Sequence, residues 1–227
     1  MPNAFDPAYV SGGSSSGSAY AVATGQVDFA LGTDTADSER VPAGLNNIVG
    51  FKPSKGLISA NGVVPAAQSV DCVSVFAPTV ALAAQVVAAA IGPDPQDPFS
   101  RQLDLARPAW TGHFRFGVPQ PLQFFGDTQA AAAFKDAVAR LQALGGVPVP
   151  VDFTLLSQAA ALLYESALVA ERYLAIRDFF DHHEHEVMEP VRSIIASGRR
   201  YSAADHCDAL LKLQALAARV APMWAGI

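Results

Sequence analysis

The sequence predicts an α/β fold with a mixed sheet core and flanking helices, and three observations support this prediction. Short apolar segments bounded by Gly, Ser, Thr, Asn and Pro occur throughout residues 1–76. A strand, a helix and a second strand are indicated over residues 114–152, and an almost continuous helical pattern covers residues 154–224. Strands that alternate with helices are typical of an α/β layer.

The first third of the chain has the pattern of short buried strands joined by ordered loops. Apolar runs at residues 28–31 and 48–51 are each enclosed by turn-forming residues. Between these runs, the segment 18–24 ends directly before Gly25. Glycine is favoured just beyond the end of a helix, so we expect a short helix here.

A helix and a proline-rich loop are expected next. The apolar pattern predicts a helix over residues 78–91, with Pro78 in its first turn, where proline is tolerated. Four prolines then fall between residues 92 and 110. Proline interrupts helices and sheets, so we expect a surface loop.

The strand-helix-strand unit follows this loop. Residues 114–119 and 147–152 are predicted to be strands. Asp127 is expected to cap a helix that runs to about Leu144, and Gly145 with the following glycine is expected to end it.

The last third is predicted to be helical. Helix caps are expected at Thr154 and Ser202, with a break around Pro190 and Gly198. No internal repeat or low-complexity linker is present, so we expect one domain. In that domain residues 1–76 hold loops and core strands, 77–152 form an α/β portion, and 153–227 form a helical layer.

Composition restricts the class of protein. Hydrophobic residues make up 51% of the 227 residues and charged residues 16%, and no apolar run reaches the roughly 18 residues of a membrane span. The net charge is −6 with scattered basic residues, which argues against a nucleic-acid partner. Cys72 and Cys207 lack metal-ligand spacing and are expected to be free core thiols in a reducing compartment. No secretory signal is visible, so we expect a cytoplasmic protein with a small-molecule partner and no membrane.

Two serine-containing motifs are the most informative feature. The run GGSSSGS occupies residues 12–18, and GTDTADSERVPA occupies residues 32–43, so that Ser38 lies 24 positions after Ser14. A Gly/Ser run alone is typical of a flexible or phosphate-binding loop. Together, however, the two motifs resemble the signature of the amidase signature family, and the resemblance continues through residues 47–76.

This resemblance implies an amidase signature fold and a Ser-cis-Ser-Lys triad that needs no cofactor. It implies that Ser38 is the nucleophile and that Ser14, preceded by a cis peptide, relays its proton. A serine hydroxyl is a weak nucleophile until a base takes its proton, and backbone amides can stabilise the developing alkoxide. The resemblance assigns that oxyanion hole to the amides of Thr35, Ala36, Asp37 and Ser38.

The sequence departs from the family pattern at the base. The family's catalytic lysine lies well upstream of the serine loop, and this chain begins thirteen residues before Ser14. Lys52 and Lys55 fall in a structural part of the motif, so we do not expect either lysine to be the catalytic base. We therefore expect a chain that is truncated at both ends, lacks the catalytic lysine and is inactive alone.

A second departure flanks the nucleophile. Asp37 and Glu39 stand where the family favours glycine and a small or apolar residue. Asp37 would bring a carboxylate to the oxyanion hole and a Cβ where backbone freedom is needed, and both effects oppose catalysis. The alternative is that the Asp37 side chain faces solvent.

Segments outside the signature resemble the allophanate hydrolase branch of the family, chiefly residues 161–177 and 201–205. This implies hydrolysis of allophanate to ammonia and carbon dioxide in urea degradation, with Tyr164 and Arg172 binding the substrate. A guanidinium can hold a carboxylate through two parallel hydrogen bonds. Eight residues on one helix would put the two side chains on adjacent faces. The alternative is an ordinary amphipathic helix with Arg172 paired to a neighbouring glutamate.

The run HHEHE at residues 182–186 contains side chains that bind zinc or nickel. Neighbouring residues on a helix point to different faces, and only His182 and Glu186 form an i, i+4 pair. We therefore expect solvated helix surface and no metal.

Two other functions remain open. One is a catalytically dead amidase-like protein that binds a small carboxylate through Arg172 and Tyr164. The other is an amidase with a different amide or ureido substrate, such as biuret or a glutaminyl amide. Exposed sheet edges favour association, so a homodimer is a further candidate assembly.

Overall fold

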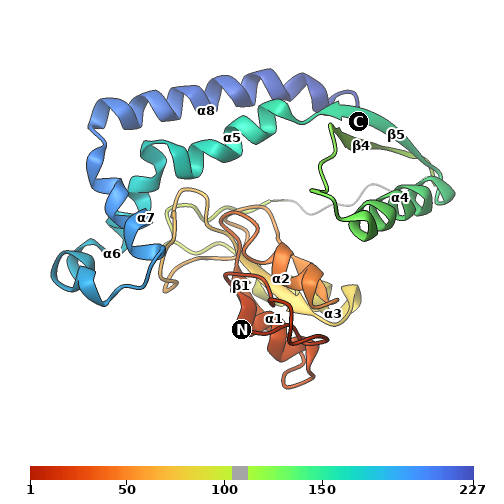
Figure 1. Cartoon of the computed structure of the whole chain (residues 1–227), viewed down its shortest axis with the longest axis horizontal. Helices are drawn as coiled ribbons and strands as arrows, with labels where there is room; N and C mark the ends of the chain where they lie inside the picture. Colours follow the sequence, from red (N-terminus) through yellow and green to blue (C-terminus); the bar gives the residue numbers. More distant parts are fainter. Residues whose placement is uncertain (104–111) are drawn as a thin grey trace. The chain divides into compact units, whose positions relative to one another are not determined.

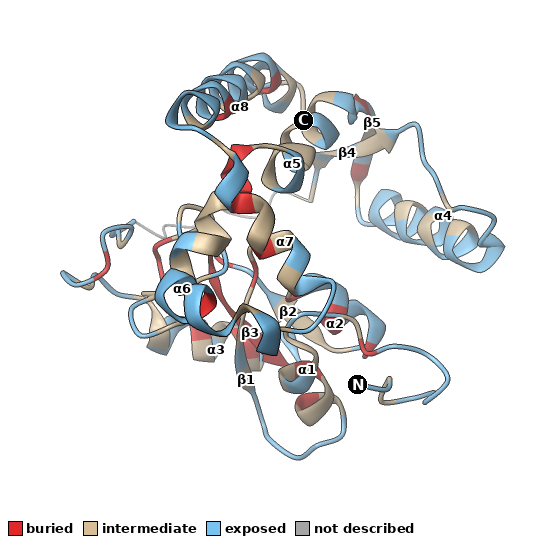
Figure 2. Ribbon diagram, turned by 60° about the vertical axis from the view of Figure 1, so that its left-hand side comes forward, coloured by how far each residue is buried: buried red, intermediate tan, exposed pale blue. Residues whose placement is uncertain are grey.

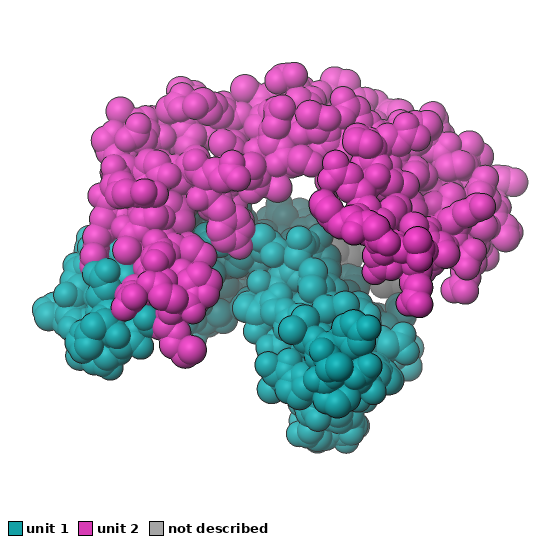
Figure 3. Space-filling view, viewed as in Figure 1, with its two compact units in different colours: residues 1–105, 171–187 teal, residues 106–170, 188–227 magenta. Residues whose placement is uncertain are grey.

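A computed structural model describes residues 1–103 and 112–227, which form two compact units (Figure 3). Unit 1 comprises Met1–Leu105 and Glu171–Val187, and unit 2 comprises Ala106–Ala170 and Met188–Ile227. The loop expected over residues 92–110 is confirmed as far as residue 103, and its remainder lies outside the described residues.

Unit 1 contains a three-stranded antiparallel sheet in the order β1-β3-β2 (Figure 1). Its strands are β1 (Ala30–Thr33), β2 (Val49–Phe51) and β3 (Val73–Ala77). The helices of unit 1 are α1 (Ser16–Ala23), α2 (Arg40–Leu45), α3 (Val80–Ala90), α6 (Ala170–His183) from its second residue onward, and the short 3-10 helix η2 (Glu184–Glu186).

Strand β3 organises the core of unit 1, because all five of its residues are buried (Figure 2). Side chains alternate across a strand, so successive residues of β3 enter different clusters. Val73, Val75 and Ala77 pack in a cluster that includes residues of α3. Phe76 packs in a second cluster with residues of α1 and α2. Helices on both faces of β3 therefore hold the loops that precede α1 and α2.

Two helix boundaries in unit 1 test the sequence predictions. Helix α1 ends two residues before Gly25, as expected. Helix α3 begins later than expected, at Val80, because the Thr79 side chain accepts a hydrogen bond from the Leu82 amide at 3.2 Å. Pro78 therefore precedes the cap, and its placement in the first turn was wrong.

Unit 2 contains a parallel pair of strands, β4 (Phe114–Gln120) and β5 (Gly146–Asp152), joined through α4 (Thr128–Ala143). Parallel strands require a crossover connection, which this helix supplies. Asp127 caps α4 by accepting from the Ala130 amide at 2.8 Å. The predicted strand-helix-strand unit is thus confirmed.

The remainder of unit 2 is helical, and Figure 1 shows α5 running beside α8. The elements are α5 (Thr154–Glu165), η1 (Ala167–Val169), α7 (Val191–Ser197), η3 (Gly198–Arg200) and α8 (Ala203–Trp224). The expected cap of α8 at Ser202 is confirmed, and Ser202 forms a reciprocal capping box with Asp205. Thr154 is not a cap: it is the first helical residue, and its amide donates to the Asp152 carboxylate at 2.9 Å.

Two further expectations concern the surface. Cys72 is buried, whereas Cys207 is exposed on α8, so the prediction that both thiols lie in the core was wrong for Cys207. Within residues 1–103 and 112–227, no helix combines the length and apolar character that crossing a membrane requires.

Candidate active site

The two serine motifs form neighbouring loops in unit 1. The first loop leads into α1, and the second connects β1 to α2. The peptide bond between Gly13 and Ser14 is cis, as the family resemblance implies. The Ser15 amide donates to the Ser38 carbonyl at 3.0 Å. The Ser15 hydroxyl also exchanges hydrogen bonds of 3.2 Å with the backbone of Thr33. Ser15 therefore joins the loop of Ser14 to the turn of Ser38, a role that the sequence analysis missed.

Asp34 organises the turn that carries Ser38. Its carboxylate is fully buried and accepts hydrogen bonds from the backbone amides of Asp37 at 3.0 Å and of Glu39 and Arg40 at 3.4 Å. It also accepts from the Arg40 guanidinium at 3.0 and 3.1 Å. Burial alone would raise the pKa of Asp34, but the Arg40 guanidinium and the amides of Arg40 and Asp37 outweigh it and hold the pKa below its usual range.

The amides assigned to the oxyanion hole differ in availability. The Asp37 amide already donates to Asp34. Across the described part of the chain, the amides of Thr35, Ala36 and Ser38 have no acceptor in hydrogen-bonding geometry. An oxyanion hole needs amides that are free when substrate arrives. Three of the four expected donors meet this requirement.

The Thr35 side chain ties the turn to a second loop. Its hydroxyl donates to the Asp71 carboxylate at 2.5 Å. Asp71 is buried and also accepts from the amides of Ala66 at 2.8 Å and Ala67 at 3.1 Å. The Asp34 amide donates to the Cys72 carbonyl at 2.8 Å. The turn of Ser38 is therefore attached to this loop at two adjacent positions.

No base is associated with the two serine hydroxyls among the described residues. Ser14 is exposed and Ser38 is half-buried, and neither hydroxyl forms a hydrogen bond within residues 1–103 and 112–227. Lys55 instead donates to the Ser69 carbonyl at 2.5 Å and lies over the Phe99 ring at 4.0 Å. Lys52 is exposed. Within the described residues, neither lysine forms a hydrogen bond to Ser14 or Ser38.

Asp37 adopts the left-handed backbone conformation, with φ of +71°. Its side chain is 61% exposed and pairs with the Arg40 guanidinium at 2.7 Å. The solvent-facing alternative for its carboxylate is thus confirmed, and the backbone requirement that favours glycine is also present.

Replacing Asp37 with glycine is expected to stabilise unit 1 by roughly 0.5–1 kcal/mol, because glycine adopts positive φ freely and an exposed ion pair contributes little. Urea unfolding measures the change. Asp37→Asn, which removes the ion pair while tolerating the same conformation, is the control. A glycine variant less stable than the asparagine variant would contradict this explanation.

Glu39 follows Ser38 and is fully buried. Neither carboxylate oxygen has a hydrogen-bond partner within the described residues. The side chain packs against Gly50 of β2, where a Cβ would lie only 2.9 Å from Glu39 Oε1. Burial, and then the neighbouring charge of Asp34, raise the pKa of Glu39 to about 7. The sequence identified this residue as unusual but did not predict its burial.

Tyr164 and Arg172 do not share a helix, so the expectation of adjacent faces on one helix was wrong. Tyr164 lies exposed near the end of α5, and Arg172 lies half-buried near the start of α6. Ser166 separates the two helices with an extended backbone at φ −133° and ψ −178°. Its hydroxyl donates to the Leu162 carbonyl at 2.6 Å, which stabilises the end of α5. Such side-chain bonds to the backbone compete with helix continuation.

The HHEHE run lies where α6 ends and η2 begins. His183 Nδ1 is 2.8 Å from Glu186 Oε1, and His182 Nδ1 is 2.8 Å from the Asp178 carbonyl oxygen. Both histidines are exposed, as expected for solvated helix surface. In the described parts of the chain, no three His, Cys, Asp or Glu side chains are grouped as a metal site would require.

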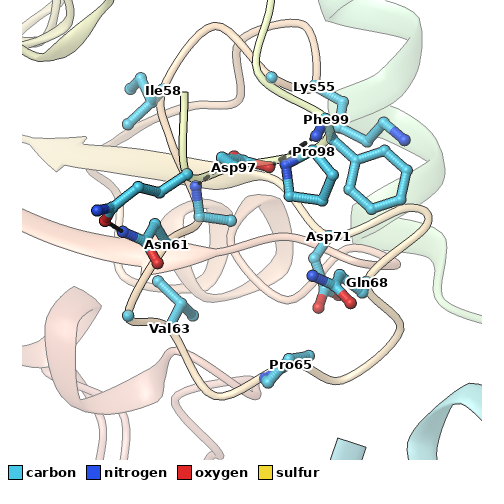
Figure 4. Close-up of a pocket in the computed structure, with 14 residues that line it drawn as sticks. Lys55, Ile58, Asn61, Val63, Pro65, Gln68, Asp71, Asp97, Pro98 and Phe99 are labelled. Atoms are coloured by element: carbon cyan, nitrogen blue, oxygen red, sulfur yellow. Dashed lines mark hydrogen bonds between the residues drawn. The ribbon is translucent and has the colours of Figure 1, made fainter. Parts of the chain in front are cut away.

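A pocket of about 120 Å³ lies beside the Asp71 loop (Figure 4). Lys55, Asp71, Asp97 and Phe99 are among its lining residues. The Asp97 carboxylate accepts from the amides of Ala60 at 2.9 Å and Phe99 at 2.8 Å. The charged groups of this pocket thus already form hydrogen bonds within the protein, and Asp71 among them contacts the turn of Ser38 through Thr35.

A family model described as Amidase matches residues 1–225, and the chain therefore belongs to the amidase family. The urea amidolyase of Saccharomyces cerevisiae is 44% identical over 209 residues, which cover 90% of this chain and 11% of that protein. A serine-to-alanine variant of Kluyveromyces lactis allophanate hydrolase aligns with a TM-score of 0.94 and 40% identity. That alignment covers 100% of this chain and 38% of the relative.

A different kind of amidase is also similar. One of the glutamyl-tRNA(Gln) amidotransferase subunits of Halobacterium salinarum is 40% identical over 173 residues, covering 73% of this chain and 41% of that protein. The chain thus spans less than half the length of each of these relatives. The expected fold, an α/β amidase signature fold, is confirmed.

Proposed function

We propose that the chain belongs to an amidase-type hydrolase that cleaves allophanate through an acyl intermediate on Ser38. The observation that carries the proposal is the Ser15 link, which holds the Ser14 loop against the Ser38 turn. Ser38 Oγ would attack the amide carbonyl while its proton passes to Ser14, whose own hydroxyl proton would pass to a base. That base would return a proton to the departing nitrogen, so that the C–N bond breaks and ammonia leaves as the acyl-enzyme forms. Water would then release the acyl group and regenerate the Ser38 hydroxyl.

The oxyanion would be held by the amides of Thr35, Ala36 and Ser38. This is narrower than the set of four implied by the family, because Asp34 already accepts from the Asp37 amide. A fixed donor aimed at the developing charge typically accelerates such a reaction by 10²–10³-fold. Asp34 would act indirectly, by holding the turn in the shape that leaves the other amides free.

Arg172 and Tyr164 would bind the substrate. Allophanate carries a carboxylate, which a guanidinium holds through charge-assisted hydrogen bonds. Similarity to urea amidolyase and allophanate hydrolase supports this substrate class. We accordingly propose a role in urea breakdown, in the cytoplasm.

A glutaminyl amide is the second candidate substrate, favoured by the similarity to the amidotransferase of Halobacterium salinarum. Biuret is a third, and it lacks a carboxylate. In a chimera with Kluyveromyces lactis allophanate hydrolase, where turnover is expected, Arg172→Ala should abolish activity toward allophanate selectively. An equal loss for all three amides would remove the reason to prefer allophanate.

We further propose that this chain alone does not turn over substrate. The supporting observation is that no described group in hydrogen-bonding contact with Ser14 or Ser38 can accept the proton. The Ser-cis-Ser-Lys triad would then require a lysine from elsewhere, and the isolated chain would be the catalytically silent carboxylate binder considered above.

We propose that the chain associates with a second copy of itself as a homodimer and that it has no nucleic-acid or membrane partner. Strands β1 and β2 are the outer strands of the three-stranded sheet, and Leu31 and Phe51 on them are 49% and 41% exposed. Unpaired strand edges with apolar side chains favour such pairing.

The function is tested in a chimera in which residues 1–227 replace the matching 38% of Kluyveromyces lactis allophanate hydrolase. Ammonia release from allophanate is expected from the chimera and not from the chain alone. Ser38→Ala in the chimera should lower kcat by at least about 10³-fold, since the nucleophile is lost. A folded chimera that stays inactive even after Asp37→Gly and Glu39→Gly would refute the proposed hydrolysis. If the isolated chain releases ammonia from allophanate and Ser38→Ala abolishes this release, the proposal that the chain alone is inactive is refuted.

A further inference from the structure

We infer that Glu171 is a positioning residue, which fixes the start of α6, and hence Arg172, relative to the nucleophile turn through the loop at residues 66–72. This inference rests on the proposed function, in which Arg172 binds the substrate carboxylate. It concerns residues of unit 1 only.

The first contact joins Glu171 to Ser69, 102 residues earlier in the chain. Glu171 Oε2 accepts from the Ser69 amide at 2.9 Å, and Oε1 accepts from the Ser69 hydroxyl at 2.5 Å. Both residues are half-buried. Two hydrogen bonds to one carboxylate define its orientation as well as its distance, and charged acceptors form the stronger bonds.

The second contact lies two residues further along the same loop. Asp71 accepts from the Thr35 hydroxyl, and the Cys72 carbonyl accepts from the Asp34 amide. Thr35 is one of the amide donors proposed for the oxyanion. The loop therefore contacts the nucleophile turn through Asp71 and Cys72 and the start of α6 through Ser69.

The loop between these contacts is itself well held. The amides of Val70 and Asp71 both donate to the Ala67 carbonyl at 2.9 Å, and Ala67 is fully buried. The Asp71 carboxylate accepts from the amides of Ala66 and Ala67, and Lys55 donates to the Ser69 carbonyl. Because the loop is held in this way, a displacement at one of its two contacts also displaces the other. Arg172 follows Glu171 directly, so its backbone position is set by the same contact.

A simpler role for Glu171 is to stabilise α6 as an acidic residue in the first turn of the helix. That role does not involve Ser69. The two explanations therefore differ in the effect of Ser69→Ala, which should reproduce the effect of Glu171→Gln only where the hydrogen-bonded link matters.

The link is tested without any ligand, by hydrogen exchange in the full chain. Glu171→Gln and Ser69→Ala should each raise the exchange rates of amides in residues 66–71 and 172–176 by about tenfold or more. Asp178→Asn, an exposed carboxylate on the same helix, is the matched control and should leave both segments unchanged. Unchanged exchange in Ser69→Ala would overturn the inference.

The positioning role is tested by binding in the Ser38→Ala background, which prevents turnover. The probes are malonamate, in which a methylene replaces the bridging nitrogen of allophanate, and its neutral diamide, malonamide. Glu171→Gln should weaken malonamate binding about tenfold and leave malonamide binding unchanged, because only the carboxylate contact depends on Arg172.

The outcomes separate this inference from the proposed function. If the parent binds malonamate and Glu171→Gln binds it equally well, the inference fails while the function stands. An equal loss for both probes means general loosening of the site and also overturns the inference. A parent that binds neither probe refutes the substrate role of Arg172, and the positioning role fails with it.

Discussion

Replacing Glu39 with glutamine is expected to remove a pH dependence of about 3 kcal/mol from the free energy of unfolding. The pKa of Glu39 is about 7 in the folded chain, against 4.5 for an ordinary glutamate. Below pH 4.5 the carboxyl is protonated in both the folded and the unfolded chain. Its contribution to the free energy of unfolding is then at its maximum. Between pH 4.5 and 7 the unfolded chain releases the proton while the folded chain retains it, so stability falls. Glutamine cannot titrate and should show no such fall.

The measurement is urea unfolding at several pH values, taken as the difference between parent and Glu39→Gln. A difference cancels the titrations that both proteins share. Asp28→Asn removes an exposed carboxylate from the same unit and is the control. If the parent and Glu39→Gln lose stability in parallel from pH 4.5 to 7, the buried carboxyl is not protonated in the folded chain.

Replacing Asp34 with alanine should destabilise unit 1 by about 3–5 kcal/mol, because three backbone amides lose their acceptor at roughly 1–3 kcal/mol for each donor left buried without a partner. The buried carboxylate accepts from three backbone amides and from the Arg40 guanidinium. No other side chain in the described residues accepts from these three amides. The turn carrying Ser38 should therefore loosen before the rest of the unit unfolds.

Urea unfolding gives the stability change, and hydrogen exchange in residues 35–40 reports the turn. Asp28→Ala is the comparison and should change stability by no more than about 0.5 kcal/mol, as expected for a surface position. A loss below about 1 kcal/mol in Asp34→Ala would show that water replaces the carboxylate without difficulty.

Local features were predictable because neighbouring residues decide them. The Asp127 and Ser202 caps and the end of α1 before Gly25 each depend on a few adjacent residues. Where a local pattern competed with another local interaction, the prediction failed. Pro78 was displaced from α3 by the cap at Thr79, and Ser166 divided the expected helix between Tyr164 and Arg172.

The amino-acid sequence by itself determined the family and the fold class of this protein, because the spacing of its two serine motifs is a property of the chain. Only the tertiary structure decided how the residues around Ser38 are used. Strand β2 encloses the Glu39 carboxyl, and the Glu171 carboxylate accepts hydrogen bonds from Ser69, 102 residues earlier in the chain. Both contacts join segments that are separate in the sequence, and the pattern of neighbouring residues carries no information about which separate segments pack together.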